Sequence, residues 1–235
     1  MSEPIVFLPG MMCDARLFGP QLAAMSSTHA VMVAPITQGE RVEDIAGALL
    51  DLLPRRFALA GLSMGGIVAM ELMRRAPERI TRLCLLDTNP LAEIPQVAAM
   101  REPQIVAAKT GRLLEVMRDE MKPNYLAPGP ARQDVLDLVM EMARTLGPDV
   151  FIRQSRALQR RRDQQGTLRR VHVPTMVICG EHDALCPVRR HTFMAELIVN
   201  ARLHVLENAG HLPTLETPDE VIDLLYDWMN MPTAA

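Results

Sequence analysis

The feature that most constrains the fold of this chain is the alternation of short apolar runs with longer stretches of helical periodicity. Continuous apolar runs are typical of parallel strands that are buried on both faces, and the stretches between them suit crossover helices. The pattern therefore predicts a doubly wound α/β fold. Strands are expected at residues 4–8, 31–34, 57–61, 83–87, 174–179 and 202–206, and helices at residues 16–25, 42–53, 64–75, 188–198 and 218–230.

The segment from residue 89 to residue 172 is longer than an ordinary crossover, which needs only about a dozen residues. It contains no strand-like run, but it shows helical periodicity near residues 94–108, 111–122, 131–146 and 148–162. We expect residues 89–172 to form a helical cap, inserted into an α/β core of residues 1–88 and 173–235.

The end of the expected cap is rich in arginine. A solvated helix face is the usual origin of such a run, and attraction of an acidic substrate is the other interpretation. The pattern alone leaves both open. The residues are Arg153, Arg156, Arg160, Arg161 and Arg162.

Composition excludes several classes of function. The chain has 235 residues, with 25 Lys and Arg against 28 Asp and Glu, for a formal net charge of −3. This balance provides no basic field for a phosphate backbone, so we expect no nucleic-acid partner. Crossing a bilayer takes about 20 consecutive apolar residues, and the apolar runs of this chain are much shorter, so we expect no membrane span.

The cysteines and the first residues predict a cytoplasmic protein. The N-terminal residues lead directly into an apolar run, without the basic region and the separate apolar region of a signal peptide. Four cysteines are too few for a disulfide framework in a chain of this length, so we expect thiols in a reducing compartment. They are Cys13, Cys84, Cys179 and Cys186.

The motif with the most chemical content is Gly-x-Ser-x-Gly at residues 61–65, with Ser63 at its centre. It follows an expected strand and precedes an expected helix, which is the context that this motif requires. Glycines flank the serine because side chains there would collide with the neighbouring strand and helix. We expect a strained turn that holds the Ser63 hydroxyl above the sheet.

A serine hydroxyl is a poor nucleophile at neutral pH and needs a base and an orienting acid. Asp183 follows the expected strand at 174–179, and His211 lies on a glycine-containing loop after the expected strand at 202–206. The carboxyl ends of parallel strands share one edge of the sheet, so this order predicts that Ser63, Asp183 and His211 meet there.

Two other acidic residues are alternatives to Asp183. Asp87 ends the expected strand at 83–87, and Glu181 lies in the same turn as Asp183. The remaining histidines lack the context of a catalytic loop and are expected at the surface or in packing. They are His29, His172, His191 and His204, while His182 adjoins Asp183 and is expected to point away from it if Asp183 points into the site.

On these residues the chain resembles the α/β-hydrolase superfamily, in particular its small capped serine esterase-like members, over nearly its whole length. The run Gly61–Gly65 resembles the nucleophile elbow, Gly180–Asp183 resembles the acid turn and Ala209–His211 resembles the histidine loop. Few residues precede the first expected strand, where many relatives begin with an antiparallel hairpin. We therefore expect a reduced, mostly parallel sheet of about six strands with helices on both faces.

The resemblance implies a role for each site residue. Ser63 would be the nucleophile, His211 the general base and then acid, and Asp183 the group that orients His211. The backbone N–H groups of Met11 and Met64 would form the oxyanion hole. Many relatives carry a histidine where this chain has Pro9, a change that leaves the backbone donor of the loop in place.

The substrate pocket is expected to be apolar. Met12, Leu62 and Leu212 adjoin the site residues in the sequence and are the candidates for its wall. Methionine is common, with 17 residues, and its flexible side chain suits either a plastic acyl pocket or gap filling in the core. For the methionines of the expected cap, the sequence favours neither interpretation over the other.

The sequence predicts a serine hydrolase that cleaves small-molecule carboxylic esters through an acyl-enzyme, with no metal and no cofactor. No metal-ligand spacing and no glycine-rich phosphate loop occurs in it. Hydrolysis of a thioester, a lactone or a C–C bond, or perhydrolysis, remains an alternative with the same triad. A hydroxynitrile-lyase-type activity is disfavoured because Leu212, and not lysine, follows His211. A ligand receptor without turnover is disfavoured by the complete set of triad residues.

Overall fold

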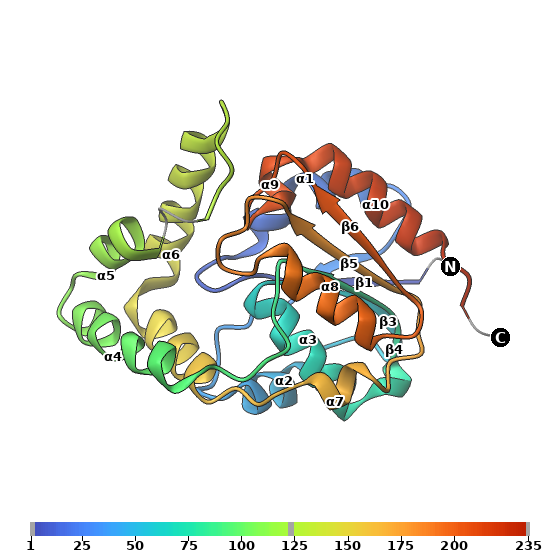
Figure 1. Cartoon of the computed structure of the whole chain (residues 1–235), viewed down its shortest axis with the longest axis horizontal. Coiled ribbons are helices and arrows are strands. Elements are labelled where there is room, and N and C mark those ends of the chain that lie inside the picture. Colours follow the sequence, from blue (N-terminus) through green and yellow to red (C-terminus); the bar gives the residue numbers. More distant parts are fainter. Residues whose placement is uncertain (1–2, 122–124, 234–235) are drawn as a thin grey trace.

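Six parallel strands form one sheet in the described part of the chain, in the order β2-β1-β3-β4-β5-β6 (Figure 1). The computed structural model describes residues 3–121 and 125–233. The α/β fold and the reduced, parallel sheet that the sequence predicted are confirmed. The strands are β1 (Ile5–Leu8), β2 (Val31–Val33), β3 (Phe57–Leu62), β4 (Ile80–Leu86), β5 (Thr175–Gly180) and β6 (Ala201–Leu206).

Burial along the sheet follows strand position. Every residue of β1, β3 and β5 is buried, which explains why these strands are continuous apolar runs in the sequence. The edge strands β2 and β6 are only partly buried. Phe7 in β1 pairs with Val33 of β2 on one side and with Ala60 of β3 on the other.

Helices cover both faces of the sheet, as expected. On one face α1 packs against α10, and on the other α3 lies on the central strands and contacts α2 and α7, while α8 packs on β5 and β6 (Figure 1). Their bounds are η1 (Ala15–Phe18), α1 (Gly19–Met25), α2 (Val42–Leu50), α3 (Met64–Arg75), η2 (Pro77–Arg79), α7 (Gln165–Leu168), α8 (Val188–Leu197), α9 (Pro213–Glu216) and α10 (Pro218–Asn230).

The long segment between β4 and β5 is helical throughout much of its length. Figure 1 shows α4, α5 and α6 grouped to one side of the sheet, apart from the helices that cover its faces. The elements are α4 (Pro95–Lys109), α5 (Leu113–Glu115), the π-helix η3 (Val116–Met121) and α6 (Arg132–Gln159). Within the described residues, none of the helices has the length and apolarity needed to cross a bilayer.

Two details of this segment differ from the expectation. The expected helix at 111–122 is split into α5 and the π-turn η3, and its last residue lies outside the described residues. The helix α7 lies within the expected cap but packs against α3 and α8 of the core. The break expected at residue 147 is present, because Gly147 has a φ of 78° and kinks α6 there.

A buried carboxylate joins α3 to the chain that returns from the cap. Glu71 of α3 accepts hydrogen bonds from Arg74 at 2.7 Å, from Arg75 at 2.8 Å and from the Gln164 side chain at 2.9 Å. Burial by itself would raise the pKa of Glu71, but these hydrogen bonds outweigh it and lower the pKa to about 2.

Replacing this carboxylate should cost stability in a pH-dependent way. A lowered pKa in the folded state means that the stabilisation is present above the ordinary pKa of about 4.5 and is lost as the pH falls toward 2. We expect Glu71→Gln to lower the free energy of unfolding by about 2 kcal/mol at pH 7. Urea denaturation between pH 7 and pH 3 measures the difference, which should shrink as the pH falls.

The exposed Glu78, which follows α3, provides the matched control. Glu78→Gln removes the same charge without a buried partner and should change the free energy of unfolding by less than about 0.5 kcal/mol. A Glu71→Gln variant as stable as Glu78→Gln at pH 7 would show that the hydrogen bonds of the Glu71 carboxylate do not stabilise the fold.

Candidate active site

Ser63 occupies a strained turn between β3 and α3. Its φ of 54° and ψ of −116° lie in a region that residues with side chains rarely adopt. The flanking glycines permit the turn because a Cβ at Gly65 would lie 2.0 Å from the carbonyl oxygen of Leu8, and one at Gly61 would lie 2.4 Å from that of Gly65. No other residue type fits these two positions without a shift of the backbone.

Hydrogen bonds from the neighbouring strand hold this turn. The Ser63 N–H donates to the Leu86 carbonyl at 2.9 Å, and the Thr88 hydroxyl donates to the Ser63 carbonyl at 2.7 Å. The Thr88 N–H in turn donates to Nε2 of the buried His191 at 3.0 Å. Burial lowers the pKa of His191 to about 4, which keeps the ring neutral and Nε2 free to accept. His191 is thus a packing residue, but one that supports the elbow.

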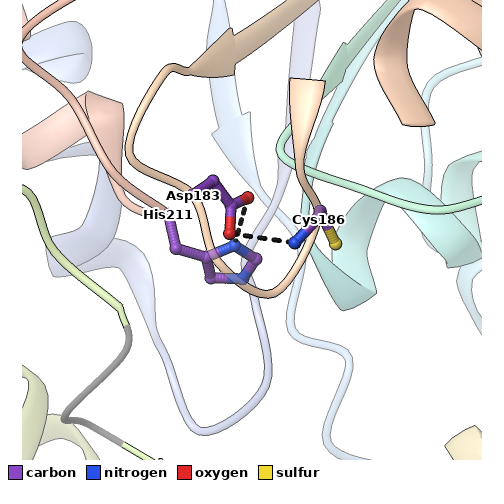
Figure 2. A group of neighbouring side chains, drawn as sticks. All are labelled: Asp183, Cys186 and His211. Carbon is purple, nitrogen blue, oxygen red and sulfur yellow. Dashed lines mark hydrogen bonds and ion pairs between the residues drawn. The ribbon is translucent and has the colours of Figure 1, made fainter. Parts of the chain in front are cut away.

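Ser63, His211 and Asp183 are hydrogen-bonded in series. His211 Nε2 lies 2.8 Å from Ser63 Oγ, and His211 Nδ1 lies 2.8 Å from Asp183 Oδ2. The other Asp183 oxygen accepts the N–H groups of Leu185 at 2.8 Å and Cys186 at 2.9 Å. Figure 2 shows the carboxylate between the imidazole ring and the backbone of Cys186. This geometry allows a proton to pass from the serine to the ring while the carboxylate orients it.

Close backbone packing brings the acid turn to the histidine loop. A Cβ at Gly180, the last residue of β5, would lie 2.1 Å from the Gly210 carbonyl oxygen, so the loops after β5 and β6 are in direct contact. The Glu216 carboxylate accepts the N–H groups of Gly210 and Leu212, each at 2.9 Å, on both sides of His211. It also accepts the Ala127 N–H of the expected cap at 2.7 Å.

The electrostatics distinguish Asp183 from its alternative Asp87. Burial would raise the pKa of Asp183, but the charge and hydrogen bonds of its partners, His211 first, outweigh it and lower the pKa. Asp87 is fully buried, accepts the Gly180 N–H at 2.9 Å and lies within hydrogen-bond reach of the Asp183 carboxylate. Burial and the negative charge of Asp183 raise the pKa of Asp87 well above its usual value. As the pH falls, Asp87 therefore takes up a proton before Asp183 does.

Two backbone N–H groups are free beside the serine. No acceptor among the described residues takes the N–H of Met11 or of Met64, the first residue of α3. A Cβ at Gly10 would lie 3.5 Å from the Ser63 Cβ, so the loop after β1 borders Ser63. The buried Gln154 accepts the Met12 N–H at 2.9 Å and thereby ties this loop to α6.

A cavity of about 420 Å³ opens over Ser63 and His211. Its apolar wall includes both methionines of the free N–H groups and side chains from the segment between β4 and β5. Among the cap methionines, Met100 and Met121 line it, whereas Met117 and Met142 are core residues. The apolar lining includes Met11, Met64, Ile67, Leu91, Ile94, Val97, Met100, Met121, Leu158 and Leu185.

Three residues expected in the pocket wall, Met12, Leu62 and Leu212, do not line this cavity. All three are buried in the apolar core. The φ of 56° at Met12 redirects the chain after Met11, and side chains on a strand alternate, so Leu62 and its neighbour Ser63 do not share a direction. Adjacency in the sequence did not predict the side-chain direction.

Sequence reasoning did not identify three supporting residues: Thr88, Gln154 and Glu216. Thr88 and Gln154 bond to the backbone of segments that are distant in the sequence, at Ser63 and at Met12. Glu216 accepts the backbone N–H groups of the histidine loop. Their residue types are common at such positions and carry no motif. The fold alone therefore reveals them.

Asp183, Cys186 and His211 also form the one group of potential metal ligands in the described part of the chain, with ligand atoms within 4.8 Å of one another. The donor set suits a metal poorly, because Asp183 and His211 bond to each other. Burial, together with the charges of Asp183 and Asp87, raises the pKa of the Cys186 thiol well above its usual value, whereas metals bind the thiolate.

A parallel sheet with a serine on a strained strand-to-helix turn, bonded in series to histidine and aspartate from later strand ends, defines the class of α/β hydrolases. The chain belongs to the alpha/beta hydrolase family, whose model matches residues 5–224.

The relatives and the solved structures agree with this assignment. A pimeloyl-[acyl-carrier protein] methyl ester esterase of Aromatoleum aromaticum is 29% identical over 81% of this chain and 80% of its own length. A putative carbamate hydrolase, RutD, of Pseudomonas savastanoi pv. phaseolicola is 25% identical over 97% of this chain and 94% of its own. The structure of a thermophilic esterase from Thermogutta terrifontis superposes with a TM-score of 0.86 at 24% identity, covering 97% of this chain and 90% of that one.

The two acids can be separated with a serine-directed fluorophosphonate probe. Asp183→Asn should slow labelling of Ser63 by a factor on the order of 1,000, because the imidazole loses its orienting carboxylate. Asp87→Asn should change the labelling rate by less than about threefold, since a neutral amide replaces a carboxyl that readily takes up a proton. The labelling rates at pH 7, with circular dichroism to verify folding, provide the comparison. The opposite pattern would assign the orienting role to Asp87.

Proposed function

We propose that this chain is a serine hydrolase that cleaves small carboxylic esters through an acyl-enzyme. The observation that carries the proposal is the chain of two 2.8 Å contacts from Ser63 through His211 to Asp183, at a cavity bordered by two free backbone N–H groups. The relatives named as a methyl ester esterase and as a carbamate hydrolase support a reaction at a carbonyl carbon.

In the acylation half-reaction, Ser63 Oγ attacks the ester carbonyl carbon and His211 Nε2 takes the hydroxyl proton. The N–H groups of Met11 and Met64 stabilise the oxyanion, and the N-terminal end of the α3 dipole favours the same negative charge. The tetrahedral intermediate collapses, the bond to the alkoxide oxygen breaks, and His211 gives its proton to the leaving alcohol. Asp183 stays ionised and stabilises the imidazolium.

In the deacylation half-reaction, His211 activates a water molecule that attacks the acyl carbon. The second tetrahedral intermediate releases the carboxylic acid and returns the proton to Ser63. Every step uses groups of this chain and water. The segment between β4 and β5 covers the cavity with apolar side chains, so it sets the size of the acyl or alcohol group that fits.

Activity on p-nitrophenyl esters of increasing acyl length tests the proposal directly. We expect the native protein to hydrolyse them with a preference for one length, because a cavity of about 420 Å³ limits the acyl group. Ser63→Ala should reduce kcat by a factor on the order of 10,000 or more. Initial rates over a range of ester concentrations give kcat and KM for each ester.

A carbamate and a thioester of the preferred acyl length should accompany this series. Native protein that is folded, labels with fluorophosphonate and cleaves only the carbamate or the thioester would move the assignment to that bond. Protein that neither labels nor turns over any of these compounds would contradict the hydrolase proposal.

The triad residues should also act as a unit. Ser63→Ala and His211→Ala should each remove nearly all activity, and the double variant should be no more than about tenfold slower than the slower single variant. Steady-state kinetics on the best ester measures this. Additive losses in the double variant would show that the two residues act in separate steps.

A further inference from the structure

The catalytic cavity contains a cluster of charged residues that ester hydrolysis does not require. Its wall includes three arginines, Arg101 of α4, Arg161 after α6 and Arg190 of α8, with two glutamates, Glu93 and Glu120. Glu120 is exposed and accepts a hydrogen bond from the Gln104 side chain. The deeper part of the cluster therefore has one carboxylate for three guanidinium groups.

Glu93 is shared between two of these arginines. It accepts two hydrogen bonds from Arg101, at 2.7 and 2.8 Å, and its other contact is an ion pair with Arg161 at 3.5 Å. The Glu93 side chain is buried, with 2% exposed, and the side chains of Arg101 and Arg161 are largely buried, with 16% and 11% exposed. Arg161 also donates from Nε to the neutral Leu91 carbonyl at 3.0 Å. The bidentate geometry assigns the Glu93 charge mainly to Arg101, so the charge of Arg161 is only weakly neutralised.

Arg190 has no acceptor for its guanidinium among the described residues. Its side chain is half-buried in the cavity wall. In the arginine-rich end of α6, Arg153 donates to the Thr37 carbonyl, and Arg156, Arg160 and Arg162 pair with Glu102, Glu40 and Glu43. Of that arginine-rich run, Arg161 alone lines the cavity.

The positive charges act on one another. Burial lowers the pKa of Arg161, and the charges of Arg101 and Arg190 lower it further, against the opposing effect of Glu93. Arg161 and Arg190 also act electrostatically on the thiol of Cys186, whose N–H donates to Asp183. The two arginines thus lie near the acid turn of the triad, where an anion would relieve their repulsion.

We propose that Arg161 and Arg190 form an anion-binding subsite in the catalytic cavity, and that the preferred substrate is an ester carrying a second, carboxylate group. This inference rests on the proposed ester hydrolysis and names its substrate class. A carboxylate matches the fork of a guanidinium and would offset one of the two unbalanced positive charges of the cluster. The apolar lining accepts the carbon chain between the carboxylate and the ester.

The test compares p-nitrophenyl valerate with mono-p-nitrophenyl glutarate, which have acyl chains of equal length. The native protein should favour the glutarate in kcat/KM by about tenfold or more, mainly through KM. A second pair, phenyl butyrate and 4-carboxyphenyl butyrate, carries the charge on the alcohol part. Preference for the anionic ester in either pair supports the subsite and shows which part of the substrate it takes.

Arg190→Gln removes the unpaired charge and should reduce the anionic-to-neutral ratio of kcat/KM by about tenfold. Arg189→Gln is the matched control, because Arg189 is the exposed neighbour on the same helix and does not line the cavity. It should leave the ratio unchanged. Equal kcat/KM values for the anionic and neutral esters of both pairs in the native protein would overturn the proposal. Equal effects of Arg190→Gln and Arg189→Gln on the ratio would also overturn it.

Binding separates this inference from the proposed function. Ser63→Ala cannot form an acyl-enzyme, so calorimetry with monomethyl glutarate and with methyl valerate reports the subsite without turnover. Binding of the anionic ester alone, lost when Arg190→Gln is added, supports the subsite even if no ester is hydrolysed. Hydrolysis of neutral esters without binding of monomethyl glutarate would overturn the subsite and leave the hydrolase proposal standing.

Discussion

The close contact between the start of α3 and the end of β1 is the constraint on which the site depends. Because Gly65 lies against the Leu8 carbonyl, α3 can begin immediately after β3, and the chain must turn at Ser63 through a strained conformation. The same contact places the first N–H of α3 beside the loop after β1. One steric requirement therefore positions the serine and both free N–H donors together.

The parallel sheet collects the remaining groups. β5 and β6 both end at the edge where β3 delivers Ser63, so the turns that follow them bring Asp183 and His211 to the same place. Glu216 then holds the histidine loop by its backbone. Such support matters because proton transfer needs hydrogen-bond distances, which loops by themselves do not maintain.

The groups around Ser63 and the wall of the cavity come from different parts of the chain. The triad and the N–H donors belong to the loops of the sheet, whereas much of the cavity wall belongs to the segment between β4 and β5. That segment contributes apolar side chains together with Arg101 and Arg161. A charged, partly apolar wall beside Ser63 is a physical basis for substrate choice on a fold that supports many activities.

The sequence by itself determined which strands the candidate residues Ser63, Asp183 and His211 follow. Continuous apolar runs predicted the buried strands, and the motif around Ser63 required its strand and helix because only glycine tolerates those backbone contacts. Tertiary structure decided the rest: that Asp183 and not Asp87 meets His211, that Met12, Leu62 and Leu212 turn into the core, and that Arg161 faces the cavity while its neighbours pair elsewhere. The physical reason is that side-chain direction and charge pairing depend on residues distant in the chain, which local periodicity does not record.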